Sequence, residues 1–251
     1  MSRVKDKVII VTGAASGLGL ADATVLAREG ARVIMTDING DAGVKCANEI
    51  GATFITQDVS EEGSWSAVMA QVERDFGRLD GLVNNAGVAP IASIEDTTTE
   101  MWRQVLSIHL DATFWGCQSA IQLMKKSGGG SIVNMSSTAA LIGLGPYLAY
   151  SAAKGGIRAM TKSIAIHCRQ AGLNIRCNSV HPDGILTDMV SRMQGDFPEM
   201  APDNGARAME FACEPEAVAE VICFLASSGS RHINGAEIRV DNSSTVQVPY
   251  F

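Results

Sequence analysis

Short apolar runs alternate with longer segments of helical periodicity along this chain. Residues 8–11 are continuously apolar and end at a Thr-Gly pair, which predicts a strand buried on both faces. Apolar positions over about 18–28 recur with helical spacing, so a helix is predicted to follow. Further strands are predicted at residues 32–36, 53–56, 79–83, 131–134, 174–180 and 238–240, with helices near 41–50 and 61–76, from 97 to about 128, and around 150.

Strands separated by helices imply right-handed crossovers and a parallel sheet. We therefore predict an α/β fold, in which a doubly wound parallel sheet of about seven strands carries helices on both faces. The 251 residues, 46% of them hydrophobic, suffice for one large core, and no linker, repeat or low-complexity segment divides them. Residues 1–251 are predicted to form a single domain.

Sequence signals predict where the helix before the fifth strand begins and where it ends. Thr97 and Glu100 have the spacing of a capping box, which predicts the start of the helix. Apolar residues such as Val105 continue it, and their spacing places His109 on the inward face. Three glycines from Gly128 onwards are expected to end it.

One long segment, residues 184–215, breaks the alternation of strands and helices. It carries methionines and other apolar residues among Gly, Pro and Asp, and long irregular excursions in compact domains are usually functional. We interpret it as a lid over the substrate, with Met189 and Met193 in contact with that substrate. The alternative is a helical excursion that packs on the sheet or on a partner subunit.

Charge and cysteine content narrow the possible partners. The net charge is −7, and the 20 Lys and Arg residues are scattered, so no nucleic-acid interface is predicted and a small-molecule partner fits better. No apolar run approaches the length of a membrane span. The six cysteines lack Cys-x-x-Cys spacing, which favours reduced packing residues in a cytoplasmic protein without a metal site.

A glycine-rich loop between the first strand and the first helix predicts a phosphate site. Glycines there allow close approach of a pyrophosphate, and the exposed N–H groups at the helix start attract its charge. Asp37 ends the second strand, where a carboxylate can accept hydrogen bonds from the adenosine ribose and repel a 2′-phosphate. No cation lies nearby, so NAD is predicted over NADP, although a solvated turn carboxylate is the alternative for Asp37. The loop residues are Gly13, Ser16, Gly17, Leu18 and Gly19.

Tyr150 and Lys154 lie four residues apart in a predicted helix, so both can point into one space. A nearby cation favours phenolate, so we expect Lys154 to lower the pKa of Tyr150 toward the range useful for acid–base catalysis. A tyrosine and a lysine at this spacing also occur in many helices without any catalytic role.

Taken together, these motifs resemble the short-chain dehydrogenase/reductase family over essentially the whole chain, which implies a Rossmann fold. The glycine loop and the Tyr-x-x-x-Lys pair match, and Ser137 stands thirteen residues before the tyrosine, as the family requires. The remaining matches are Asp58-Val59, on the adenine side of the site, and Asn84-Asn85-Ala86-Gly87.

The resemblance implies hydride transfer between NAD and an alcohol or ketone. Ser137 would hold the substrate oxygen and Tyr150 would remove the hydroxyl proton. Lys154 would lower the pKa of Tyr150 and bind the nicotinamide ribose, while Ile185 and Thr187 would meet the carboxamide. Family members commonly assemble as homotetramers, so a homotetramer is expected here.

One position departs from the family pattern. Where the family has an asparagine that holds a water of a proton relay to the lysine, this chain has His109. Histidine can also donate and accept protons, so we expect His109 to keep the relay, with a packed structural histidine as the alternative.

The late segment His181-Pro182-Asp183-Gly184 carries an extra Asp, a feature similar to bacterial 3β/17β-hydroxysteroid dehydrogenase-like members of the family. For Asp183 itself a turn residue without ligand contact is favoured over a catalytic role. The predicted activity is an NAD-dependent dehydrogenase for bulky apolar secondary alcohols, whether steroid, alicyclic or aryl. The alternatives are an NADPH-dependent 3-oxoacyl-thioester reductase and a catalytically weak nucleotide-binding regulatory protein.

Overall fold

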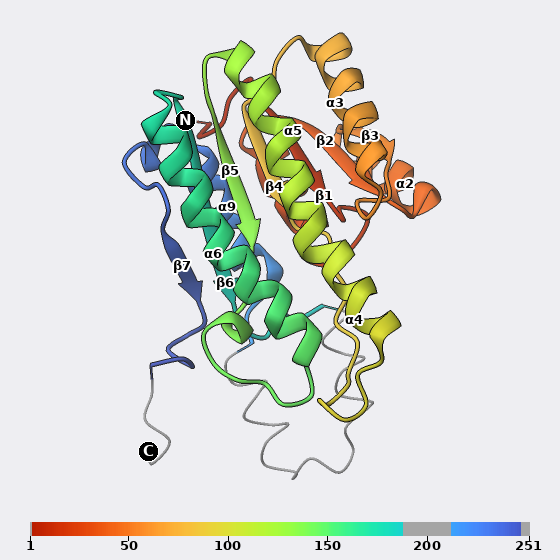
Figure 1. Cartoon of the computed structure of the whole chain (residues 1–251). Helices are drawn as coiled ribbons and strands as arrows, with labels where there is room; N and C mark the ends of the chain where they lie inside the picture. The colour runs from red at the N-terminus through yellow and green to blue at the C-terminus, as the bar shows by residue number, and fades with distance from the viewer. Residues whose placement is uncertain (1, 188–211, 247–251) are drawn as a thin grey trace.

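The computed structural model describes residues 2–187 and 212–246, and seven strands in these ranges form one parallel sheet (Figure 1). The spatial order is β3-β2-β1-β4-β5-β6-β7, so the chain builds outward from β1 in one direction and then in the other. This is the doubly wound arrangement of a Rossmann fold, as predicted. The strands are β1 (Val8–Thr12), β2 (Arg32–Asp37), β3 (Thr53–Thr56), β4 (Gly81–Asn84), β5 (Gly130–Met135), β6 (Ile175–Pro182) and β7 (Glu237–Val240).

Helices cover both faces of the sheet because alternate residues of each strand point to opposite faces. Val8 and Ile10 pack with α3, α5 and α6, whereas Ile9 and Val11 pack with α1, α2 and α9. Figure 1 shows α5 and α6 in front of the sheet and α9 behind it. The described helices are α1 (Gly17–Arg28), α2 (Gly40–Ile50), α3 (Glu62–Phe76), α4 (Thr99–Leu106), α5 (Ala112–Ser127), α6 (Leu148–Gln170) and α9 (Pro215–Ala226), with short turns η2 (Thr138–Ala140) and η3 (Ser228–Ser230).

A π-helical turn, η1 (Ser107–Asp111), interrupts the helix that was predicted to run unbroken from 97 to 128. The start of that helix also differs from the prediction. The N-cap is Thr98, whose hydroxyl accepts a hydrogen bond from the Met101 N–H at 3.2 Å, so Thr97 and Glu100 do not form the predicted capping box. The other end agrees, since Gly128 follows α5 with a φ of 87° that suits glycine.

The predicted strand at 79–83 begins later than expected, at Gly81. The preceding residues are engaged in other contacts. The Asp80 carboxylate accepts a hydrogen bond from the Val8 N–H at 2.9 Å and pairs with Arg78, and the Leu79 N–H donates to the Ser127 hydroxyl. These contacts fix the start of β4 before its ladder begins.

The proposed lid lies mostly outside the described residues. Met189 and Met193, predicted to contact substrate, fall there. The two described ends of the segment meet in a parallel bridge between Ile185 and Cys213, and Pro215 then starts α9.

All six cysteines are free thiols. None of the described helices is long and apolar enough to cross a membrane.

Asp22 is an acid buried inside the fold. It lies on α1 with its side chain fully inaccessible, and neither carboxylate oxygen has a hydrogen-bond partner among the described residues. Burial therefore raises the pKa of Asp22 well above its usual range. The native protein holds this group as a neutral acid at pH values where the unfolded chain has already lost the proton.

We predict that Asp22 makes wild-type stability fall with pH relative to an Asp22→Asn variant. Below about pH 4 the acid is neutral in both states, whereas above it only the unfolded chain ionises, so the native state loses up to about 1.4 kcal/mol per pH unit against Asn. Urea unfolding of both proteins between pH 4 and 7 measures this difference. Glu49→Gln removes an exposed carboxylate and serves as the control. A difference between wild type and Asp22→Asn that stays constant with pH would contradict the assignment.

Candidate active site

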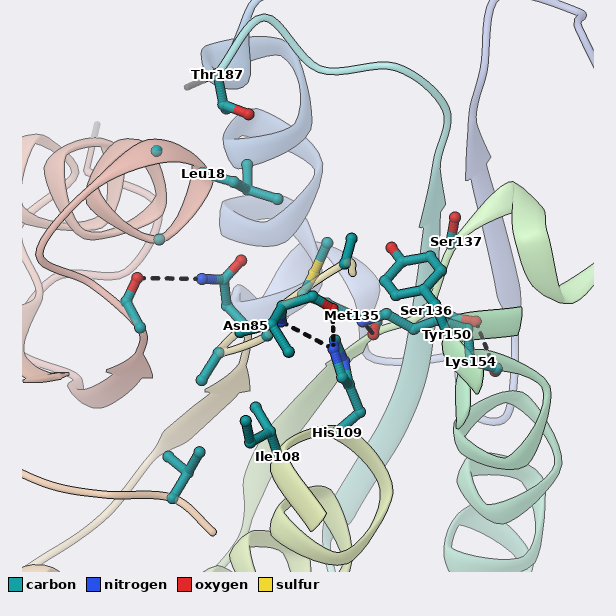
Figure 2. A pocket seen from close by; sticks show the side chains of 18 of the residues that line it. Leu18, Asn85, Ile108, His109, Met135, Ser136, Ser137, Tyr150, Lys154 and Thr187 are labelled. Atoms are coloured by element: carbon teal, nitrogen blue, oxygen red, sulfur yellow. Dashed lines mark hydrogen bonds between the residues drawn. The ribbon is translucent and has the colours of Figure 1, made fainter. Parts of the chain in front are cut away.

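The strand order reverses between β1 and β4, and ligands of such sheets bind outside the carboxyl ends of the strands at this point. A cavity of about 690 Å³ opens there, lined by residues that follow β1 to β6 and by residues of α4, η1 and α6 (Figure 2). Apart from Met189 and Met193, every predicted site residue lines it. Those residues are Gly13, Ser16, Gly17, Leu18, Gly19, Asp37, Asp58, Val59, Asn85, Ala86, Gly87, His109, Ser137, Tyr150, Lys154, Ile185 and Thr187.

The glycine loop is held by the residues that follow β4. The Thr12 hydroxyl accepts hydrogen bonds from the N–H groups of Asn85 at 3.0 Å and Ala86 at 3.1 Å. The Asn85 amide donates in return to the Thr12 carbonyl at 3.0 Å. The loops after β1 and β4 therefore form one rigid wall of the cavity.

Close backbone packing explains why glycines occupy this loop. A Cβ at Gly13 would lie 2.7 Å from the Ala86 Cα, and one at Gly19 would lie 2.2 Å from the Gly13 carbonyl oxygen. Gly13 and Gly17 also have positive φ angles of 64° and 54°, which glycine adopts readily. The loop thus presents bare backbone at the start of α1, and these residues fit a pyrophosphate.

Two carboxylates mark the far end of the cavity, after β2 and β3. Asp37 accepts hydrogen bonds from the N–H groups of Ala15 at 3.0 Å and Asn39 at 2.9 Å, which fix its orientation. Asp58 accepts from the Ser60 N–H at 2.9 Å and the Ser60 hydroxyl at 2.6 Å. Both side chains line the cavity, as expected for groups that recognise a nucleoside.

Ser137 lies at the turn between β5 and η2, with its hydroxyl beside Tyr150 (Figure 2). The Ser137 oxygen accepts a hydrogen bond from the Ala139 N–H at 3.1 Å, which leaves its proton available to a second partner. Both residues line the cavity, and the Ser137 hydroxyl favours ionisation of the Tyr150 phenol. The two hydroxyl groups can therefore meet one substrate oxygen.

Lys154 is tied to the end of β5. Its ammonium donates to the Met135 carbonyl at 2.6 Å, and its own carbonyl accepts from the Ser136 hydroxyl at 3.0 Å. The ammonium lies 5.4 Å from the centre of the Tyr150 ring. The predicted helical spacing thus does bring the tyrosine and the lysine together.

The expected effect of Lys154 on Tyr150 is not found. The pKa of Tyr150 is raised, because burial of the phenol outweighs the effect of the Ser137 hydroxyl, which favours its ionisation. Burial also lowers the pKa of Lys154 to about 7, so its charge is only partly present at neutral pH. The sequence prediction assumed a full charge on Lys154 and ignored the desolvation of both groups.

His109 lies in the π-helical turn, 2% exposed, and contacts Tyr150 edge-on at 5.4 Å between ring centres. Its Nε2 lies 2.7 Å from the carbonyl oxygen and 2.9 Å from the N–H of Val88, while Nδ1 has no partner among the described residues. Burial, and then the charge of Lys154, lower the pKa of His109 to about 3. The ring is therefore neutral at neutral pH, with one nitrogen unengaged.

Two contacts that fix the turn at Ser137 were not predicted from the sequence. Both come from residues at the end of β6. The Nδ1 of His181 lies 3.1 Å from the Ser137 carbonyl oxygen, and the Thr138 hydroxyl donates to Asp183 at 3.2 Å. Asp183 also lines the cavity, which the turn interpretation did not anticipate. The pairing of β5 with β6 brings these segments together, and that pairing cannot be read from the local sequence.

The fold and cavity define the class as a nucleotide-binding α/β protein with hydroxyl and amine groups at one end of its site. Residues 13–244 match the family model described as enoyl-(acyl carrier protein) reductase. The chain belongs to the short-chain dehydrogenase/reductase family, and it is therefore an oxidoreductase that uses a nicotinamide cofactor.

Three relatives each match at least 96% of the chain. The NADP-dependent (R)-specific alcohol dehydrogenase of Lentilactobacillus kefiri is 42% identical, over 98% of this chain and 99% of the relative. The 3-beta-hydroxysteroid dehydrogenase of Comamonas testosteroni is 41% identical, over 96% and 97%. The cyclopentanol dehydrogenase of Comamonas sp. (strain NCIMB 9872) is 38% identical, over 98% and 99%.

We predict that Gly87→Ala displaces His109, because a Cβ at this glycine would lie 2.3 Å from the imidazole Cε1. The overpacking should lower the free energy of unfolding by about 1–3 kcal/mol, and adding His109→Ala should recover part of that loss. Chemical denaturation of the single and double variants measures the coupling. Gly63→Ala, on α3 with nothing within 4 Å, is the control and should not destabilise. Strictly additive effects of Gly87→Ala and His109→Ala would contradict the contact.

Proposed function

We propose that this protein is an NAD-dependent dehydrogenase that interconverts bulky apolar secondary alcohols and their ketones at Ser137, Tyr150 and Lys154. The observation that carries the proposal is the neighbouring pair of Ser137 and Tyr150 hydroxyl groups in one cavity (Figure 2). The pair lies in the same cavity as the glycine loop and Asp37.

The side chains support a division of tasks around the substrate oxygen. Because the Ala139 N–H occupies a lone pair of Ser137, the Ser137 proton can be donated to the substrate oxygen and orient it. Tyr150 accepts the alcohol proton at its phenolate oxygen. A bound nicotinamide cofactor would supply the hydride acceptor for the carbinol carbon, so that alcohol and NAD⁺ would give ketone, NADH and one proton.

Lys154 places its buried amine, which is only partly protonated at neutral pH, beside the Tyr150 ring. Because burial raises the pKa of the phenol, ionisation of Tyr150 needs a compensating positive charge, and Lys154 is the one cation lining the described cavity. Alcohol oxidation is therefore expected to rise with pH as Tyr150 loses its proton.

Charge at the adenine end favours NAD. Asp37 is held by two backbone N–H groups, and no arginine or lysine among the described lining residues stands at that end to receive a 2′-phosphate. The relative from Lentilactobacillus kefiri is named as NADP-dependent. Under this proposal the two proteins therefore differ in their cofactor preference.

The chemistry of the cavity wall favours a rigid apolar substrate. Leu144, Tyr147 and Ile185 line the cavity, and the Tyr147 ring centre lies 6.4 Å from that of Tyr150. Relatives are named for cyclopentanol and a 3-beta-hydroxysteroid, both of them cyclic secondary alcohols. The expected contacts of Met189 and Met193 with substrate remain part of this proposal.

We further propose a cytoplasmic homotetramer assembled through the two long helices and the last strand. Phe114 on α5 and Ile166 on α6 are 46% and 49% exposed, and large apolar side chains at such positions suit a subunit contact.

We predict that Tyr150→Phe lowers kcat for an alicyclic alcohol by about 10²–10⁴-fold while the Kd for NADH changes less than about threefold, because the ring stays and only the proton acceptor is lost. Initial rates over small, cyclic, aryl and steroid alcohols, with NAD and NADP side by side, measure this. Wild-type activity should be NAD-linked and rise with substrate bulk. Activity confined to NADPH with β-keto thioesters would support the reductase alternative instead, and cofactor binding without turnover would support a regulatory protein.

We predict that His109 relays protons between Lys154 and solvent, because a neutral imidazole can accept at one nitrogen and donate at the other. His109→Asn should keep kcat within about threefold, whereas His109→Ala should lower it by about tenfold and alter its pH profile. His232→Ala, at an exposed position, is the control. Equal activity of the Asn and Ala variants with unchanged pH profiles would rule out the relay.

A further inference from the structure

Three carboxylates line the described part of the cavity, and they lie at different ends. Asp37 and Asp58 follow β2 and β3, at the end proposed for adenosine. Asp183 follows β6, directly before Gly184 and two residues from Ile185. It is therefore the one described acidic group at the reacting end of the cavity, where Lys154 is the one described cation.

The side chain and the backbone of Asp183 are both held by hydrogen bonds. Its N–H donates to the Val240 carbonyl at 3.2 Å, and one carboxylate oxygen accepts the Thr138 hydroxyl at 3.2 Å. Among the described residues no Lys, Arg or His forms an ion pair with it. Thr138 directly follows Ser137, so the Asp183 side chain is hydrogen-bonded to the residue next to the proposed substrate-binding serine.

The two forms of the cofactor differ in charge at this end. The oxidised nicotinamide ring carries a positive charge and the reduced ring carries none, while the rest of the dinucleotide is unchanged. We propose that Asp183 makes the site select the oxidised cofactor by placing a carboxylate beside the nicotinamide position. The inference rests on the proposed function, which puts that ring next to Ser137, Tyr150 and Ile185.

Electrostatics gives the direction of the effect. The Lys154 ammonium repels a cationic ring, and Asp183 offsets that repulsion with the opposite charge. Asp183 is only half-buried, so solvent screens its charge; at a dielectric constant near that of water, about 80, a unit charge about 3–6 Å away changes affinity by about 3- to 10-fold. Tight binding of NAD⁺ and easier release of NADH both assist alcohol oxidation, so the selection favours that direction of reaction.

The test measures the Kd for NAD⁺ and NADH by titration calorimetry in wild type, Asp183→Asn and Thr138→Val. Asn keeps an oxygen acceptor for Thr138 and removes the charge, whereas Val removes the hydrogen bond and keeps the charge. Asp183→Asn should weaken NAD⁺ binding about 3- to 10-fold and NADH binding less than twofold, and Thr138→Val should leave the ratio of the two constants unchanged.

Asp58→Asn is the matched control, because it removes a carboxylate at the adenosine end, which is identical in both cofactor forms. Asp58→Asn should weaken the binding of NAD⁺ and the binding of NADH by the same factor. If Asp183→Asn leaves the NAD⁺/NADH ratio unchanged, or if Thr138→Val shifts the ratio as much as Asp183→Asn does, the carboxylate acts only as a turn or tether and the proposal is overturned. Asp183→Ser is measured alongside, so that a folding defect of one variant does not decide the result.

The result of this binding experiment can be distinguished from the result of the test of the proposed dehydrogenase activity. Binding constants need no turnover, so a protein that binds both forms but oxidises no alcohol would contradict the proposed dehydrogenase and still decide the role of Asp183. A wild-type protein that binds neither form would overturn both.

Discussion

The hydrogen bonds between the end of β5 and helix α6 are the constraint on which the site depends. Lys154 donates to Met135, and Ser136 donates back to the Lys154 carbonyl, so the helix carrying Tyr150 is fixed against the strand that leads to Ser137. Each of these groups is buried, and an unpaired buried amine or hydroxyl would be costly. The geometry of the two hydroxyl groups is therefore set by the packing of strand against helix.

The rest of the cavity follows from the parallel sheet, which collects the carboxyl ends of its strands at one edge. Backbone without side chains lines the phosphate end, because Gly13 and Gly19 have no room for a Cβ. Fixed charges stand at the two ends, with Asp37 on one side and the pair of Lys154 and Asp183 on the other. One fold thus separates the end of the cavity proposed for the nucleotide from the end proposed for the substrate.

Much of this was predictable from sequence, for physical reasons. Continuous apolar runs located the strands, and an i,i+4 pair on a helix placed Tyr150 beside Lys154. The π-helical turn at His109 was not predictable, because the apolar spacing on either side of it still follows helical periodicity. The direction of the Tyr150 pKa was wrong because desolvation depends on tertiary burial, and the contact of Thr138 with Asp183 depends on the pairing of β5 with β6.

The central claim is direct hydride transfer from the carbinol carbon of a cyclic secondary alcohol to NAD. The measurement that tests it most directly is mass spectrometry of the cofactor after incubation with cyclopentanol deuterated at that carbon. The account predicts NADH that carries one deuterium per molecule formed in wild type, and almost none formed in Tyr150→Phe. NADH without deuterium, or labelled NADH formed equally well by the Phe variant, would contradict it.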